Sequence, residues 1–62
     1  MLWLSEILIQ NEIDTFDELK GLVEQGAKDG EMFFRMDVKP PFGDTPEDWE
    51  DLLEASFSGV KR

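Results

Sequence analysis

The chain has 62 residues, enough for one small domain spanning residues 1–62. It contains no cysteine and no histidine, which excludes a disulfide framework, a thiolate metal site and the commonest general base. Fifteen acidic residues against six basic ones give a net charge of −9. This charge disfavours direct binding to nucleic acid or to an anionic membrane, and it favours a basic protein surface as the partner.

Residues 2–9 form a short apolar run whose periodicity fits two structures. In a helix, Leu4, Ile7 and Leu8 share one face, whereas in a strand Leu4 and Leu8 lie opposite Ile7. Helix and strand therefore both stay open, and a strand would give the later strand a parallel neighbour through a right-handed crossover. The run is too short to span a bilayer, and no basic residue precedes Lys20, so we expect no signal peptide and a cytoplasmic location.

The next segment has the signature of a helix over residues 15–26. Thr15 begins a capping box, in which its hydroxyl accepts the N–H of Glu18 and the Glu18 carboxylate accepts the N–H of Thr15. Apolar residues follow at helical spacing and predict one buried face. Either Gly26 or Gly30 supplies the left-handed residue that ends the helix.

Residues 31–38 alternate between apolar and polar side chains, which predicts a strand with one buried face. Phe33 alone breaks the alternation. A single strand leaves backbone N–H and C=O groups without partners, so this one must pair with residues 2–9 or with a second copy of the chain. The residues on the predicted buried face are Met32, Phe34, Met36 and Val38.

A connector rich in proline and glycine, residues 39–45, separates this strand from a final helix over residues 46–57. Thr45 is the predicted N-cap of that helix and Pro46 its first residue. Phe42, in the middle of the connector, is expected to pack into the core.

These elements predict a single small α+β domain. It has an N-terminal helix or strand, a helix at 15–26, a strand at 31–38 and a helix at 46–57, and residues 60–62 add a short basic tail. The residues expected to pack together in its core are Leu19, Val23, Phe34, Met36, Trp49 and Leu53.

The candidate functional feature is a cluster of carboxylates between Asp44 and Glu54, where no basic residue occurs. Acidic residues four positions apart in this helix repel each other, so a sequence shaped only for helix stability would place lysine among them. A solvated surface, a docking face for Lys and Arg of a partner, and a divalent-cation site are the three interpretations, although the spacing of a calcium loop is absent. The candidate partner-binding residues are Asp44, Glu47, Glu50, Asp51 and Glu54.

We therefore expect a small acidic protein–protein interaction module that acts as an inhibitor or adaptor on a basic surface. A surface that normally holds nucleic acid is one such target, which would make the module a nucleic-acid mimic. The alternative is a structural accessory protein that forms a homodimer through its surplus apolar residues and uses its charge only for solubility. We expect that the chain is not an enzyme and binds no cofactor or metal, because it has no histidine to activate a serine and no glycine loop to hold phosphate. The candidate self-association residues are Trp3, Phe33 and Phe42.

Overall fold

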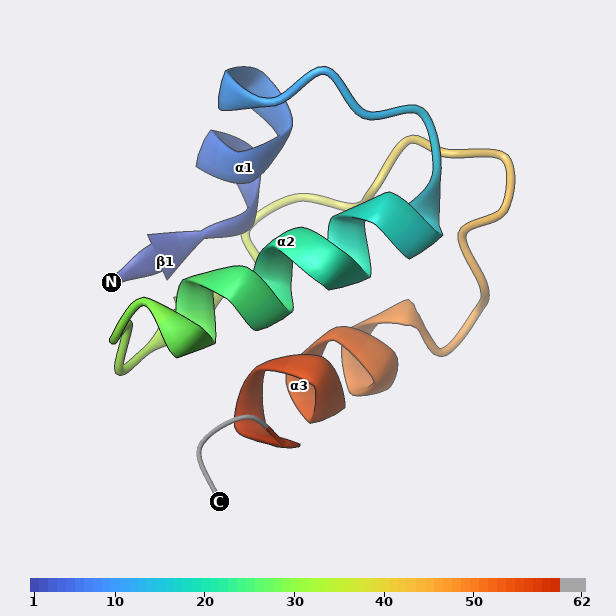
Figure 1. The fold of residues 1–62 in the computed structure, drawn as a ribbon. Coiled ribbons are helices and arrows are strands. Elements are labelled where there is room, and N and C mark those ends of the chain that lie inside the picture. Colours follow the sequence, from blue (N-terminus) through green and yellow to red (C-terminus); the bar gives the residue numbers. More distant parts are fainter. Residues whose placement is uncertain (60–62) are drawn as a thin grey trace.

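The computed structural model describes residues 1–59 and shows a small α+β domain, which confirms the predicted fold class (Figure 1). The elements in chain order are β1 (Leu2–Trp3), α1 (Leu4–Gln10), α2 (Phe16–Lys28), β2 (Phe34–Arg35) and α3 (Trp49–Gly59). Helices α2 and α3 pack against each other, and α1 contacts both β1 and α2. The predicted basic tail, residues 60–62, lies outside the described residues. Within residues 1–59, no helix combines the length and the apolar content that a membrane crossing requires.

The N-terminal segment, for which the sequence leaves helix and strand open, contains both. Its first residues form β1, which pairs in parallel with β2, so that Leu2 lies opposite Phe34 and Trp3 opposite Arg35. The chain then turns directly into α1 at Leu4. The later strand therefore finds a partner within the same chain.

β2 covers only Phe34–Arg35, so the predicted strand over residues 31–38 is correct at its centre and wrong at its ends. The pairing stops there because β1 is itself only two residues long. The predicted buried face is lost at both ends, where the side chains of Met32 (70% exposed) and Val38 (40% exposed) reach solvent. Near the centre the face is kept, because Phe34 and the half-buried Met36 pack against the core.

The start of α2 follows the predicted capping box with one difference. The Thr15 hydroxyl accepts the N–H of Glu18 at 3.2 Å, as expected. The Glu18 carboxylate, however, accepts the N–H of Asp14 at 3.3 Å and the hydroxyl proton of Thr15 at 3.1 Å, not the Thr15 N–H. The start of α2 was therefore predictable from local chemistry, because all of these partners lie within four residues of one another.

α2 continues to Lys28, beyond the predicted end at residue 26. Gly30 has a φ of 101° and is the left-handed residue that follows the helix. Gly26 instead lies within the helix, where a Cβ atom would come within 2.7 Å of Leu2 Cδ2. The missing side chain thus lets β1 approach this face of α2 closely.

α3 begins at Trp49, so the predicted start at Pro46 with Thr45 as N-cap is wrong. The Thr45 hydroxyl donates to the carbonyl of Pro40 at 3.4 Å. Asp48 takes the N-cap position instead, because its carbonyl accepts the N–H of Leu52 at 3.1 Å. The helix runs to residue 59 and not to the predicted residue 57.

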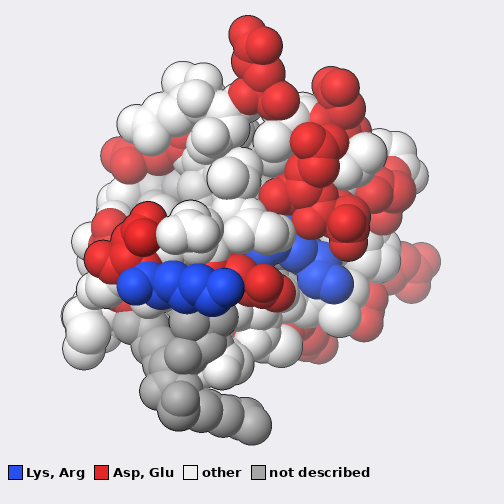
Figure 2. Space-filling view, viewed as in Figure 1, with Lys and Arg blue, Asp and Glu red and all other residues white. Residues whose placement is uncertain are grey.

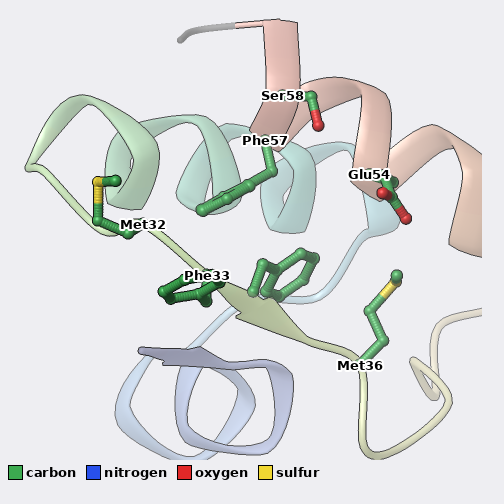
Figure 3. Close-up of a pocket in the computed structure, with 7 residues that line it drawn as sticks. Met32, Phe33, Met36, Glu54, Phe57 and Ser58 are labelled. Carbon is green, nitrogen blue, oxygen red and sulfur yellow. The ribbon is translucent and has the colours of Figure 1, made fainter.

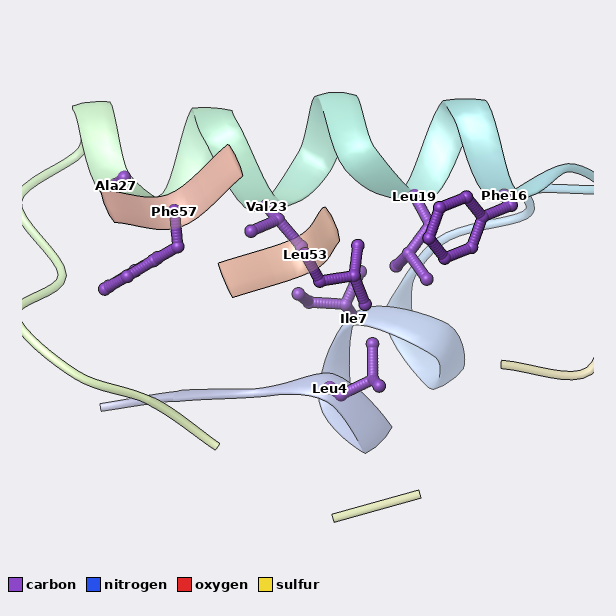
Figure 4. Packing of buried hydrophobic residues seen from close by; sticks show 8 residues of the cluster. All are labelled: Leu4, Ile7, Phe16, Leu19, Val23, Ala27, Leu53 and Phe57. Carbon is purple, nitrogen blue, oxygen red and sulfur yellow. The ribbon is translucent and has the colours of Figure 1, made fainter. Parts of the chain in front are cut away.

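The core lies between the three helices, and α2 supplies half of its buried side chains (Figure 4). Three residues of the predicted core, Leu19, Val23 and Leu53, are completely buried. The other three, Phe34, Met36 and Trp49, are half-buried and pack against its edge, as does Phe42 from the connector. The buried residues of this hydrophobic cluster are Leu4, Ile7, Phe16, Leu19, Val23, Ala27, Leu53 and Phe57.

Candidate functional site

Two adjoining hollows lie between β2 and α3, and we call them together the β2–α3 groove. The first has a volume of about 330 Å³ and the second about 300 Å³. They share the side chains of Phe34 and Met36. The first is lined by Met32, Phe33, Phe34, Met36, Glu54, Phe57 and Ser58 (Figure 3), and the second by Trp3, Phe34, Arg35, Met36, Asp37 and Glu50.

The floor of the groove is apolar and held in place by the core. Phe57 projects from α3, is only 7% exposed and belongs to the buried cluster. Its ring lies 5.5 Å from the ring of Phe34, measured between centroids, with an angle of 31° between the ring planes. This distance is typical of favourable aromatic pairs. The strand and the helix are therefore joined beneath the groove by two aromatic rings.

One end of the groove is formed by large apolar side chains that remain in solvent. Met32 is 70% exposed and Phe33 is 64% exposed (Figure 3). Adjacent exposed apolar side chains are typical of interaction surfaces in soluble proteins. Trp3, which is 37% exposed, adds a further apolar side chain at the second hollow.

Two of the predicted acidic residues stand on the rim of this groove. Glu54 lines the first hollow and Glu50 the second, and because they are one helical turn apart both project from the same face of α3. Both are exposed, and within residues 1–59 neither takes part in a salt bridge. Glu47 and Asp51 are also exposed, but they do not line the groove.

Asp44, the remaining predicted docking residue, has a structural partner. Its carboxylate accepts the backbone N–H of Phe16 at 2.8 Å. Phe16 is the first residue of α2, whose initial N–H groups have no partner inside the helix. A negative charge there also interacts favourably with the helix dipole. The structure thus separates Asp44 from the rim carboxylates and places it at the N-terminus of α2.

Asp37 makes the equivalent contact with α1. Its carboxylate accepts the backbone N–H of Ser5 at 3.1 Å, whereas Trp3, at the N-cap position, provides no side-chain cap. Hydrogen bonding from Ser5, through its side chain first and its backbone N–H as well, lowers the pKa of Asp37 below its usual value of 3.8. Partial desolvation opposes this shift. Asp37 therefore links the second hollow to the start of α1.

We expect the Asp37 contact to make stability depend on pH. Because the folded-state pKa is lowered, the contribution is fully present above the usual pKa of the aspartate carboxyl and is lost as pH falls through the lowered folded-state value. Asp37→Asn should lower the urea midpoint near neutral pH, and its difference from the parent should shrink steadily as the pH is taken down to about 2. Glu12→Gln removes an exposed charge from the α1–α2 connection and is the matched control. A difference that persists unchanged in acid would contradict an ionic cap.

The apolar self-association candidates are divided in the same way. Trp3 and Phe33 both line the groove, whereas Phe42 packs against the core from the connector and does not line it. The sequence did not single out Met36 or Phe57 as site residues. Their chemistry is that of core residues, and only the packing of β2 against α3 places them at a surface hollow.

The divalent-cation interpretation has no matching geometry within the described residues, where no group of three or more carboxylates is placed to hold a metal ion.

In comparisons with known proteins, no family model, no curated protein and no solved structure matches this chain.

Proposed function

We propose that this chain is a small acidic protein-binding module that docks on a basic surface of a partner protein and acts there as an inhibitor or adaptor. The observation that carries this proposal is the position of Glu50 and Glu54, which are exposed on α3 beside exposed apolar side chains. The proposal includes a cytoplasmic setting, in line with the absence of cysteine, and no catalytic role.

The carboxylates of Glu50 and Glu54 support docking, because they repel each other and neither forms a salt bridge within residues 1–59. Glu50 and Glu54 lie one helical turn apart, so their like charges repel by a few tenths of a kcal/mol, although Glu50 also lies in the first turn of α3, where the helix dipole favours a negative charge. Figure 2 shows acidic side chains spread over one face of the molecule, with few basic side chains between them. Lys or Arg from a partner would relieve this repulsion and would be steered to the surface by the net charge of −9.

Charge reversal on α3 tests the proposal. Glu50→Lys with Glu54→Lys should change the melting temperature only slightly, because the lysine at position 54 can pair with Asp51, while the two lysines still repel each other and the first turn of α3 loses a favourable carboxylate. Partners that the parent captures from cell extract at low salt, and releases at high salt, should be lost from this variant. Glu6→Lys with Glu12→Lys reverses two exposed charges away from α3 and should retain the same partners. Equal capture by both variants would reduce the α3 carboxylates to a role in solubility.

The second candidate function is that of a homodimer-forming accessory protein. It is favoured by one observation, the exposure of Met32 and Phe33 beside a sheet of only two strands in the described part of the chain. Sedimentation of the pure protein at micromolar concentration distinguishes it from the first. A dimer that persists when Glu50 and Glu54 are reversed would support the accessory function.

A further inference from the structure

We propose that the β2–α3 groove binds a segment of a partner protein that carries one large apolar side chain with Lys or Arg close beside it. This inference rests on the proposed function and adds the chemistry of the ligand. The apolar side chain would enter the first hollow, and the cations would meet Glu54 and Glu50 on the rim.

The size of the groove suits a side chain better than a small molecule. Its first hollow, about 330 Å³, is at the lower end of the range of about 300–1,000 Å³ found for ligand sites. Its floor is the ring of Phe57, which the core fixes, and the ring of Phe34 packed against it. The exposed thioether of Met32 adds a wall that can adapt its shape to the incoming group.

The charges on the groove select the occupant. The two hollows are lined by three carboxylates, from Asp37, Glu50 and Glu54, and by one guanidinium, from Arg35. Asp37 is engaged with Ser5, so Glu50 and Glu54 remain to receive cations. The site is therefore complementary to an apolar segment that is also basic.

A second copy of the chain fits this charge pattern poorly. Each copy has a net charge of −9, and pairing through the groove would bring identical acidic rims together. Like charges placed opposite each other at an interface oppose association. An anionic lipid surface is disfavoured for the same reason. A basic partner segment is the occupant to which the groove is complementary.

Three synthetic peptides test this inference on the full chain. The first is a short lysine-rich peptide with a single leucine, the second has that leucine replaced by serine, and the third has every lysine replaced by glutamate. Binding is followed by backbone amide chemical shifts in NMR. We expect the first to bind most tightly and to shift amides of Met32, Phe34 and Phe57. The second should bind at least about ten-fold more weakly and the third should not bind, as expected when one buried apolar contact or the charge pairing is removed.

Two variants separate the groove from general surface effects. Phe33→Ser removes an apolar side chain from the groove and should weaken the binding of the first peptide by about ten-fold. Ile9→Ser is the matched control, because Ile9 is 82% exposed on α1 and does not line the groove. The binding of the first peptide to the Ile9 variant should match its binding to the parent.

The possible outcomes distinguish a failure of this inference from a failure of the proposed function on which it rests. Equal binding of the first two peptides, unaffected by Phe33→Ser, would leave charge docking intact and overturn the groove as an anchor site. Failure of both lysine-rich peptides at low salt would overturn charge docking itself. Concentration-dependent shifts at Met32 and Phe34 without peptide, abolished by Phe33→Ser, would assign the groove to a second copy and overturn the inference.

Discussion

Phe57→Ala should lower the free energy of unfolding by about 3–5 kcal/mol, because truncating a buried phenylalanine loses both transfer free energy and packing. Phe57 is 7% exposed and contacts the Phe34 ring on one side and the core on the other. A domain of this size derives no more than about 3–5 kcal/mol from its core. The variant should therefore be largely unfolded in urea-free buffer, as measured by far-UV circular dichroism and tryptophan fluorescence.

A conservative replacement separates the ring pair from burial alone. Phe57→Leu keeps most of the apolar volume and should remain folded. A double-mutant cycle with Phe34→Leu should give a coupling free energy of about 0.5–1.5 kcal/mol, the value typical of aromatic pairs. If the free energy of unfolding of Phe57→Ala lies within about 1 kcal/mol of the parent value, the ring lies outside the core and the floor of the groove is not fixed as described.

The helix α2 was predictable because its determinants are local. Thr15 and Glu18 are three residues apart, and the Thr15–Glu18 hydrogen bonds form within that turn. The sequence also predicts that a glycine follows the end of α2, because glycine adopts positive φ without strain. The choice between Gly30 and Gly26 required the structure, in which Gly30 has the positive φ. Gly26 lies inside the helix, where the absence of a side chain leaves room for Leu2 of β1.

The start of α3 and the length of β2 were not predictable because contacts outside each element decide them, with a competing acceptor in the connector for α3 and the distant strand β1 for β2. The Thr45 hydroxyl contacts the Pro40 carbonyl instead of capping the helix. The alternation in residues 31–38 is real, but a strand extends only as far as its neighbour, and β1 ends where α1 begins at Leu4.

The candidate site was predicted in parts that the sequence could not join. Helical spacing placed Glu50 and Glu54 on one exposed face, and the surplus of aromatic residues marked Phe33 as a candidate contact. That these groups border one groove depends on how β2 packs against α3. Asp44 shows the same limit: its partner at the N-terminus of α2 lies 28 positions earlier in the chain.

Leu53→Ala is the second substitution with a large expected effect, a loss of about 2–5 kcal/mol in the free energy of unfolding. Leu53 is completely buried where α3 meets α2, and Figure 4 shows its side chain among those of Val23, Leu19 and Ile7. Every helix of the described chain contributes to this cluster, so the cavity left by alanine cannot close without moving one of them.

The neighbouring residue provides the control for Leu53→Ala. Leu52→Ala makes the same chemical change in the same helix, so the two variants share any change in helix propensity. Because Leu52 is only half-buried, it should lose clearly less stability than Leu53. Urea titrations of both variants measure the difference directly, provided that the free energy of unfolding falls with urea concentration at the same slope in both. Equal losses would mean that α3 presents a different face to the core, and Glu50 and Glu54 would then no longer border the β2–α3 groove.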